Sequence, residues 1–177
     1  MGSFYRLTKV IMGVILCSHL SLANAQWLPA SKLGLTKTPV TNLVDLQGKI
    51  FRLEQYRGQV LFVNFWATWC EPCRDEFKEV IELQKKYQHQ NFVVIAINLA
   101  ESPNKINEFF QINQIDPKSL IVVSDRNGIT YKTWKGRGIP ISFLINKKGI
   151  VDSYWLGEIT ASRSEILPHI DDLLHSP

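Results

Sequence analysis

One stretch of the chain limits its fold more than any other: an almost unbroken apolar run at residues 60–67, Val-Leu-Phe-Val-Asn-Phe-Trp-Ala. A run this long, rich in β-branched and aromatic side chains, is typical of a central strand that is covered on both faces. It ends at Thr68-Trp69-Cys70, and Pro72 then stands where a proline suits the first turn of a helix. We therefore expect a buried strand that leads directly into a helix, with Cys70 at the junction.

Strand and helix patterns alternate after this junction. We predict, in chain order, a helix at 72–87, a strand at 92–98, a helix at 103–113, a strand at 120–123, a short helix at 129–134, strands at 141–146 and 150–156, and a closing helix at 162–174. A strand, a helix and a second strand in succession imply parallel strands with a right-handed connection. The turn Lys147-Lys148-Gly149 instead favours an antiparallel pair. Pro168 should kink the closing helix or mark its start.

Two segments precede the apolar run. Residues 40–46 and 49–53 are separated by Gln47-Gly48 and predict a β-hairpin. Residues 26–37 combine Trp27 with a mixture of serine, threonine and lysine, so we expect an extended lead-in that packs lightly or not at all. The sequence shows no internal repeat and no linker, which predicts one domain at residues 38–175.

The N-terminus has the pattern of a secretory signal peptide. Arg6 and Lys9 precede an apolar stretch at residues 10–22, and Ala23-Asn24-Ala25 supplies the small residues that signal peptidase requires. The apolar stretch is shorter than the roughly 20 residues needed to cross a bilayer. We therefore predict that residues 1–25 are a signal and that the protein is periplasmic or otherwise extracytoplasmic. The alternative is an uncleaved signal, which would anchor the protein to the membrane.

The cysteine count and the charge change when this signal is removed. The chain has three cysteines, and cleavage after Ala25 would remove Cys17 and leave Cys70 and Cys73, too few for a disulfide scaffold. The signal also contains two of the 20 basic residues, so 18 bases and 16 acids would give a net charge of +2 in place of +4. Nucleic-acid binders normally carry a clustered basic face. We expect no nucleic-acid partner.

The two remaining cysteines predict thiol chemistry. Three residues apart at a strand-to-helix junction, Cys70 and Cys73 can close a small disulfide or open to a dithiol with little backbone movement. The unpaired amides and the macrodipole at the helix N-terminus favour the thiolate of Cys70. We therefore expect Cys70 to be the nucleophile and Cys73, one turn further in and more buried, to resolve the mixed disulfide by attacking Cys70.

Three other uses of a cysteine pair fit the sequence less well. A zinc site needs two further ligands, and His89, His169 and His175 are scattered without ligand spacing. Covalent haem attachment needs a histidine directly after the second cysteine, where the chain has Arg74. A purely structural disulfide with so small a ring would constrain the unfolded chain weakly. We expect a redox couple that uses no metal and no other cofactor.

Two motifs in the same order resemble the thioredoxin superfamily. The first is the run from residue 60 through Trp69-Cys70-Glu71-Pro72-Cys73, and the second is Gly138-Ile139-Pro140-Ile141. More narrowly, the chain is similar to the TlpA/ResA group of exported thiol-disulfide oxidoreductases over about residues 38–175. The resemblance implies an α/β, thioredoxin-like fold in which helices flank a central mixed β-sheet, with the hairpin as an N-terminal extension.

The resemblance also implies roles for single residues. Pro140 matches the cis-proline that lies beside the cysteine pair in this superfamily. Ile139, which precedes it, would offer backbone groups to an incoming polypeptide in strand-like fashion. Trp69 would shape the docking surface, and Trp66 would belong largely to the core.

A buried acid is the usual proton-handling group in cytosolic thioredoxins, but Asn64 stands at that position here. The TlpA/ResA group resembles this chain in having a glutamate three residues after the second cysteine, here Glu76. By that resemblance Glu76 would adjust the pKa values of the thiols and relay protons. The alternative is a solvated carboxylate in the first turn that interacts favourably with the helix dipole.

Exported members of this group are usually dedicated reductants, so the resemblance implies a protein-disulfide reductase that draws electrons from a membrane thiol reductant of the DsbD or CcdA kind. We expect the protein to be a monomer. The first candidate for its client is the haem-binding cysteine pair of apocytochrome c. The cytochrome-maturation branch has Gly-Ala-Pro-Glu around the cis-proline, and this chain differs at Ile139 and Ile141.

A peroxiredoxin would have a proline and a hydroxyl where this chain has Val63 and Ala67. A protein dithiol oxidase of the same fold and a non-catalytic peptide-binding or chaperone module remain the alternatives.

Overall fold

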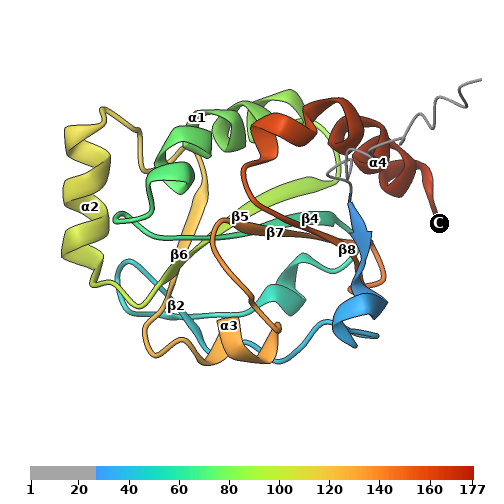
Figure 1. The fold of residues 1–177 in the computed structure, drawn as a ribbon, viewed down its shortest axis with the longest axis horizontal. Helices are drawn as coiled ribbons and strands as arrows, with labels where there is room; N and C mark the ends of the chain where they lie inside the picture. Colours follow the sequence, from blue (N-terminus) through green and yellow to red (C-terminus); the bar gives the residue numbers. More distant parts are fainter. Residues whose placement is uncertain (1–26) are drawn as a thin grey trace, which may run out of the picture.

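The computed structural model describes residues 27–177, so the predicted signal at residues 1–25 lies outside the described residues (Figure 1). The strands are β1 (Leu28–Pro29), β2 (Leu43–Asp45), β3 (Ile50–Phe51), β4 (Val60–Trp66), β5 (Phe92–Leu99), β6 (Ile121–Asp125), β7 (Ile141–Ile145) and β8 (Val151–Leu156). The α-helices are α1 (Glu71–Lys86), α2 (Pro103–Ile112), α3 (Ile129–Thr133) and α4 (Arg163–His175). Three short 3-10 helices are η1 (Ala30–Leu33), η2 (Leu53–Tyr56) and η3 (Ile159–Ser162). None of these helices is long and apolar enough to cross a bilayer.

The strands form one mixed sheet in the order β1-β8-β7-β4-β5-β6-β2-β3. Strand β4 pairs in parallel with β5 and antiparallel with β7, with Val63 opposite Ile95 and Phe143. This confirms the predicted parallel unit, the antiparallel β7–β8 pair and the thioredoxin-like α/β fold. The predicted hairpin is also confirmed, and β2 joins it to the sheet by pairing antiparallel with β6.

Strand β4 lies inside the sheet, and its side chains alternate between the two apolar layers that cover the sheet faces. Phe62 and Trp66 face the layer formed with α1, α2 and α4, whereas Val63 and Phe65 face the layer formed with η1 and the region of α3. Figure 1 shows the same division, with α1 and α4 along one side of the sheet and α3 along the other. Asn64 has the parity of Phe62, and it therefore faces α1.

The expectation for the N-terminal lead-in was wrong in one respect, because this segment packs closely. Strand β1 pairs antiparallel with β8, and Ala30, Leu33 and Leu35 are buried in the core. The Trp27 ring lies 6.1 Å from the Trp155 ring, centroid to centroid. Without this segment β8 would be an uncovered edge strand, which folded proteins avoid. The lead-in therefore belongs to the folded unit.

The closing helix begins at Arg163 and continues through Pro168 to His175, so Pro168 does not mark its start. Two buried residues, Ile166 and Ile170, lie on either side of this proline and hold the helix against the sheet. Proline removes one backbone donor from the helix, and this packing compensates for the loss.

Candidate active site

The cysteine pair lies where β4 ends and α1 begins. Cys70 and Cys73 form a disulfide with an S–S distance of 2.07 Å. Cys70 is the N-cap of α1, and the backbone N–H of Cys73 points at its Sγ atom across 3.3 Å. In the reduced state this amide can donate a hydrogen bond to a Cys70 thiolate, in addition to the effect of the helix dipole. Cys70 is 6% exposed and Cys73 is 0% exposed, which agrees with the prediction that Cys73 is the deeper of the two.

A loop that precedes β7 lies directly against Cys70. The Ile139–Pro140 peptide bond is cis, as the resemblance implied. The carbonyl oxygen of Ile139 lies 3.7 Å from Cys70 Sγ, and the carbonyl of Pro140 accepts a hydrogen bond of 2.9 Å from the Gly157 amide. The fold thus brings together two motifs that are about 70 residues apart in the chain.

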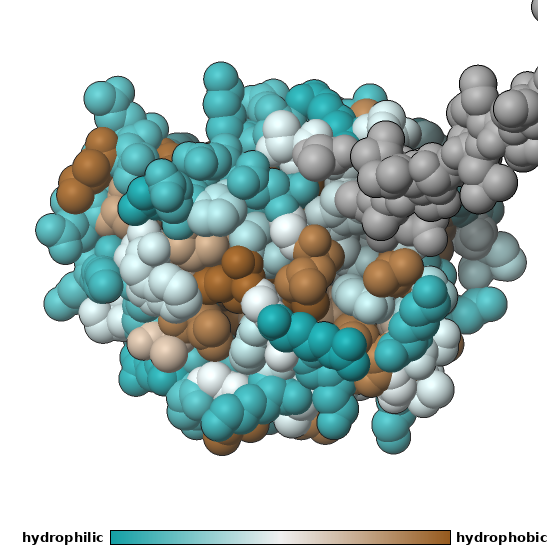
Figure 2. Space-filling model, viewed as in Figure 1, coloured by the Kyte–Doolittle hydropathy of each residue, from teal (hydrophilic) through white to brown (hydrophobic). Residues whose placement is uncertain are grey.

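Two exposed apolar side chains, Trp69 and Leu156, flank the site in the chain and in the sheet. Trp69 is 61% exposed immediately before Cys70, whereas Trp66 is fully buried against Phe77. Leu156, at the end of β8, is also exposed. A Cβ added at Gly138 would lie 3.3 Å from Leu156 Cδ1, so Leu156 lies beside the proline loop and extends the apolar surface there. On the face shown in Figure 2, hydrophobic surface gathers in a band across the middle and hydrophilic residues cover most of the periphery. Sequence reasoning missed Leu156, although it ends a predicted strand that pairs with the one after Pro140.

Glu76 is a buried carboxylate, not a solvated one. It lies one turn beyond Cys73 on α1 and is 0% exposed. Its Oε1 accepts a hydrogen bond of 2.8 Å from Asn64 Nδ2, and its Oε2 accepts one of 2.8 Å from the backbone N–H of Ile159. The alternative of a solvent-exposed first-turn carboxylate was therefore wrong. Residues three apart lie on one face of a helix, so Glu76 and Cys73 share the inward face of α1.

Burial raises the pKa of Glu76 to about 7, from an ordinary value of 4.5. The two hydrogen bonds, from Ile159 and Asn64, partly oppose this shift, and the negative charge of Glu158 adds to it. A carboxyl group with a pKa near neutrality can both accept and donate a proton under physiological conditions.

Asn64 holds Glu76 from the side of the sheet. Its Nδ2 donates to Glu76 and, at 3.0 Å, to the hydroxyl of Ser142 on β7. Its Oδ1 is buried and accepts no hydrogen bond from any residue in 27–177. Rotation of this amide would offer Oδ1 to a protonated Glu76, so Asn64 is able to hydrogen-bond both protonation states of the acid. The contacts from Ser142 and Ile159 were not predicted, because they come from strands and turns distant in sequence.

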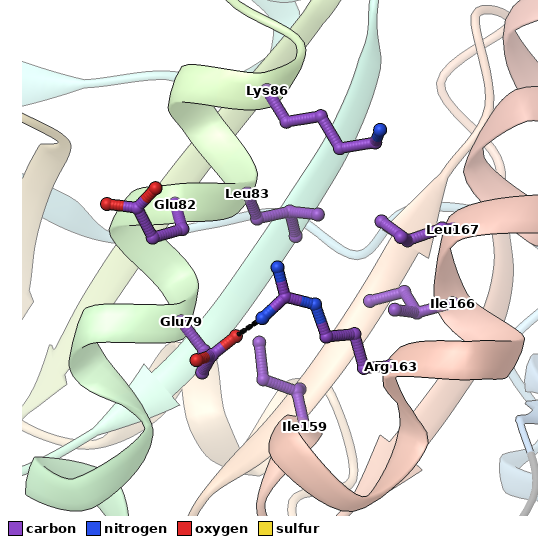
Figure 3. A pocket seen from close by; sticks show the side chains of 8 residues that line it. All are labelled: Glu79, Glu82, Leu83, Lys86, Ile159, Arg163, Ile166 and Leu167. Carbon is purple, nitrogen blue, oxygen red and sulfur yellow. Dashed lines mark hydrogen bonds and ion pairs between the residues drawn. The ribbon is translucent and has the colours of Figure 1, made fainter.

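A narrow crevice lies between α1 and α4, one turn beyond Glu76. Figure 3 shows Arg163 reaching from α4 to form an ion pair with Glu79 on α1, between Leu83 and Ile159. The cavity beneath has a volume of about 20 Å³, enough for roughly one water molecule and too small for a polypeptide or an organic ligand. This crevice therefore cannot hold a polypeptide client.

Comparisons with known proteins agree with this geometry. The sequence model of the AhpC/TSA family matches residues 35–154. The thiol-disulfide oxidoreductase ResA of Bacillus thuringiensis subsp. konkukian is 33% identical over 162 residues, which cover 90% of this chain and 92% of that protein. ResA of Geobacillus thermodenitrificans is 32% identical over 131 residues, covering 74% of this chain and 72% of that protein.

The fold has relatives among solved structures. A protein from Chlorobium tepidum, described as a thiol:disulfide interchange protein of the DsbE type, superposes with a TM-score of 0.71 and 30% sequence identity. The superposition covers 79% of this chain and 96% of that chain. Both kinds of comparison therefore point to exchange between thiols and disulfides.

Proposed function

Because the chain belongs to the AhpC/TSA family of the thioredoxin superfamily and is a thiol-disulfide oxidoreductase, we propose that it reduces disulfides of other proteins outside the cytoplasm. One arrangement carries this proposal: a Cys70–Cys73 couple at the N-terminus of α1 beside the cis-proline loop, with the buried acid Glu76 one turn further along.

The reaction follows from the position of each group. The Cys70 thiolate attacks one sulfur of the client disulfide, forms a mixed disulfide with it and releases the other client sulfur as a thiolate. The Cys73 thiolate then attacks Cys70 Sγ, which closes the Cys70–Cys73 disulfide and releases the second client thiolate. Two electrons pass to the client, whose thiolates take up the two protons that the protein's thiols lose. Glu76, with a pKa near 7, accepts the proton of Cys73 as that thiol becomes the attacking group.

The client binds along the loop that contains the cis-proline. We infer that Ile139 and Pro140 align an extended client segment beside Cys70 while Trp69 contacts its apolar side chains. A protein disulfide suits this open, apolar rim. The cysteine pair of apocytochrome c is the first client to test, because the TlpA/ResA resemblance suggests it. Ile139 and Ile141 depart from that branch's pattern, and this departure argues against that client.

The reduced state must be restored after each cycle. We propose that a membrane thiol reductant of the DsbD or CcdA kind supplies the two electrons, and that residues 1–25 direct export of the chain. Peroxide reduction has less support within the same family, because Val63 and Ala67 stand where a peroxiredoxin has a proline and a hydroxyl.

Trapping tests the proposed function. In Cys73→Ala the mixed disulfide cannot be resolved, so covalent complexes with client proteins should accumulate through Cys70 in the native compartment. Cys70→Ala is the matched control and should give none. Finding no complex with Cys73→Ala, together with wild-type behaviour of a Cys70→Ala strain, would favour a non-catalytic peptide-binding module.

The redox potential of the couple tests the direction of electron flow. A reductase should have a potential near thioredoxin's, about −270 mV, and should be largely reduced in the cell. A potential near about −120 mV with an oxidised resident form would make the protein an oxidase.

A further inference from the structure

A second buried carboxylate supports the loop that leads to Cys70. Glu101 lies between β5 and α2 and is 8% exposed. Its Oε2 accepts a hydrogen bond of 2.7 Å from the Thr68 amide, and its Oε1 accepts one of 2.6 Å from the Thr68 hydroxyl. Asn98 Nδ2 donates to the same carboxylate at 2.8 Å, and Lys105 Nζ lies 3.0 Å from Oε1. One side chain thus receives both hydrogen-bond donors of Thr68.

These donors keep the carboxylate ionised. Burial by itself would raise the pKa of Glu101, but the hydrogen bonds from Thr68, Asn98 and Lys105 outweigh burial and hold the pKa below its ordinary value. Charge-assisted hydrogen bonds of this kind are shorter and stronger than neutral ones. The contact to Thr68 therefore persists throughout the pH range in which thiols react.

The backbone around Glu101 is fixed independently of Thr68. The Glu101 amide donates to Asn98 Oδ1 at 3.3 Å, and its carbonyl accepts a hydrogen bond of 3.2 Å from the Ser124 hydroxyl on β6. Ala100 takes a left-handed conformation with a φ of 60°, and its amide donates to the Asp125 carbonyl. The backbone of Glu101 is therefore fixed to β5 and β6 independently of the contact between its carboxylate and Thr68.

Thr68 lies at the base of the tight turn that presents the site. The Cys70 amide donates to the Ala67 carbonyl at 3.2 Å, so Thr68 and Trp69 form the corner of this turn. Trp69 is largely exposed, and no hydrogen bond of its side chain holds it within residues 27–177. The orientation of Trp69 therefore depends on the segment anchored through Thr68.

We propose that Glu101 is a positioning residue that holds the Thr68–Trp69 turn so that Trp69 stands beside Cys70 when a protein client docks. The inference rests on the proposed function, because it assigns to this carboxylate a part in recognition of protein disulfides. It separates Glu101 from Glu76: Glu76 handles protons for the thiols, whereas Glu101 acts through Trp69 on the client.

The two roles predict different behaviour toward large and small disulfides. A small disulfide such as dithiobis(nitrobenzoate) reaches Cys70 without using Trp69, whereas insulin presents its disulfide within a polypeptide that must contact the rim. We expect Glu101→Ala to lower the rate constant for insulin reduction about tenfold, since a misplacement of about 1 Å can cost as much as about 100-fold. The rate with the small disulfide should stay within about twofold of wild type. Loss of folded protein would lower both rates together.

The experiment compares the reduced wild type with Glu101→Ala, Glu101→Gln and Thr68→Val on both disulfides, and uses thermal melting to confirm folding. Glu101→Gln keeps an acceptor for the Thr68 amide and should partly restore the insulin rate. Thr68→Val removes only the hydroxyl contact and should show a smaller loss. Glu108→Gln, an exposed acid on α2, is the matched control and should match wild type on both substrates.

A double-mutant cycle decides whether Glu101 acts through Trp69. Trp69→Ala should itself lower the insulin rate, and adding Glu101→Ala should then cause little further loss. Independent, multiplying effects would overturn the inference, as would equal losses on both disulfides or an unchanged insulin rate. Should Glu101→Ala not fold, the insulin-to-small-disulfide ratios of Glu101→Gln and Thr68→Val decide the question. A wild type that reduces neither disulfide would instead refute the proposed function.

Discussion

Replacing Glu76 with glutamine should remove a pH-dependent loss of stability. The carboxyl group is fully buried between α1 and the sheet, with one hydrogen bond from Asn64 and one from the Ile159 amide. A glutamine can accept from Ile159 through its oxygen. Once the Asn64 amide rotates, the glutamine amide can donate to Asn64 Oδ1, which has no partner within residues 27–177. Glu76→Gln therefore keeps two hydrogen bonds and removes only the ionisation.

The size of the effect follows from the pKa of the buried acid. In the folded protein this pKa is about 7, and the ordinary value of 4.5 applies to the unfolded chain. Between these values the folded state holds a proton that the unfolded state has released, so stability is full below about pH 4.5 and is lost as the pH rises through 7. At about 1.4 kcal/mol per pH unit, the total loss is about 3 kcal/mol, of which more than 2 kcal/mol falls between pH 5 and pH 8.

Urea denaturation of the oxidised protein measures this loss, because neither cysteine titrates in the disulfide. The difference in unfolding free energy between Glu76→Gln and wild type should grow by about 2 to 3 kcal/mol in favour of the variant from pH 5 to pH 8. Asp75→Asn is the matched control, since Asp75 is exposed on the same helical turn, and its difference from wild type should hardly change with pH. Parallel pH profiles of the unfolding free energy for wild type and Glu76→Gln would refute the conclusion that burial disfavours the ionised form of Glu76.

Three further outcomes test other parts of the structure. Leu33→Ala should lower the unfolding free energy by about 2 to 5 kcal/mol in denaturant titrations, because Leu33 is buried in the core, whereas a loosely packed lead-in would give almost no change. Gly136→Ala should lower the melting temperature, because an added Cβ would lie 2.1 Å from the Tyr131 ring, and an unchanged melt would show that the ring yields easily. His169→Gln should raise the pKa of Asp152, which the 2.7 Å contact with His169 holds below its ordinary value. NMR titration of the Asp152 carboxyl carbon measures this pKa, and an equal pKa in wild type and variant would contradict the prediction.

The chemistry of the site was predictable because it depends on neighbours in the chain. The apolar run at 60–67 indicates a buried strand, and Cys70 follows it at the first turn of a helix, so local geometry alone brings the two sulfurs together. The order of strands and helices followed from the same periodicity. The cis bond before Pro140 rested on resemblance, since the sequence of a single X-Pro pair favours trans.

The packing of the N-terminal lead-in was not predictable from local pattern. The apolar residues of 27–35 show no regular spacing that would predict a helix or a strand. They are buried only because β8 leaves an open sheet edge that this segment can cover. An isolated reading of Leu33 or Ala30 gives no sign of such a partner, which lies more than a hundred residues away.

The burial and the raised pKa of Glu76 were decided by tertiary structure. Glu76 shares the spacing of Cys73 and Val80 on the inward face of α1, but a carboxylate is normally solvated because burying its charge is costly. Its burial is tolerated because Asn64 from β4 and the Ile159 amide from η3 meet it in the interior. The sequence by itself therefore determined the redox couple, whose two groups are neighbours in the chain. Only the folded chain set the pKa of Glu76, because that value depends on burial and on donors brought from 12 and 83 residues away.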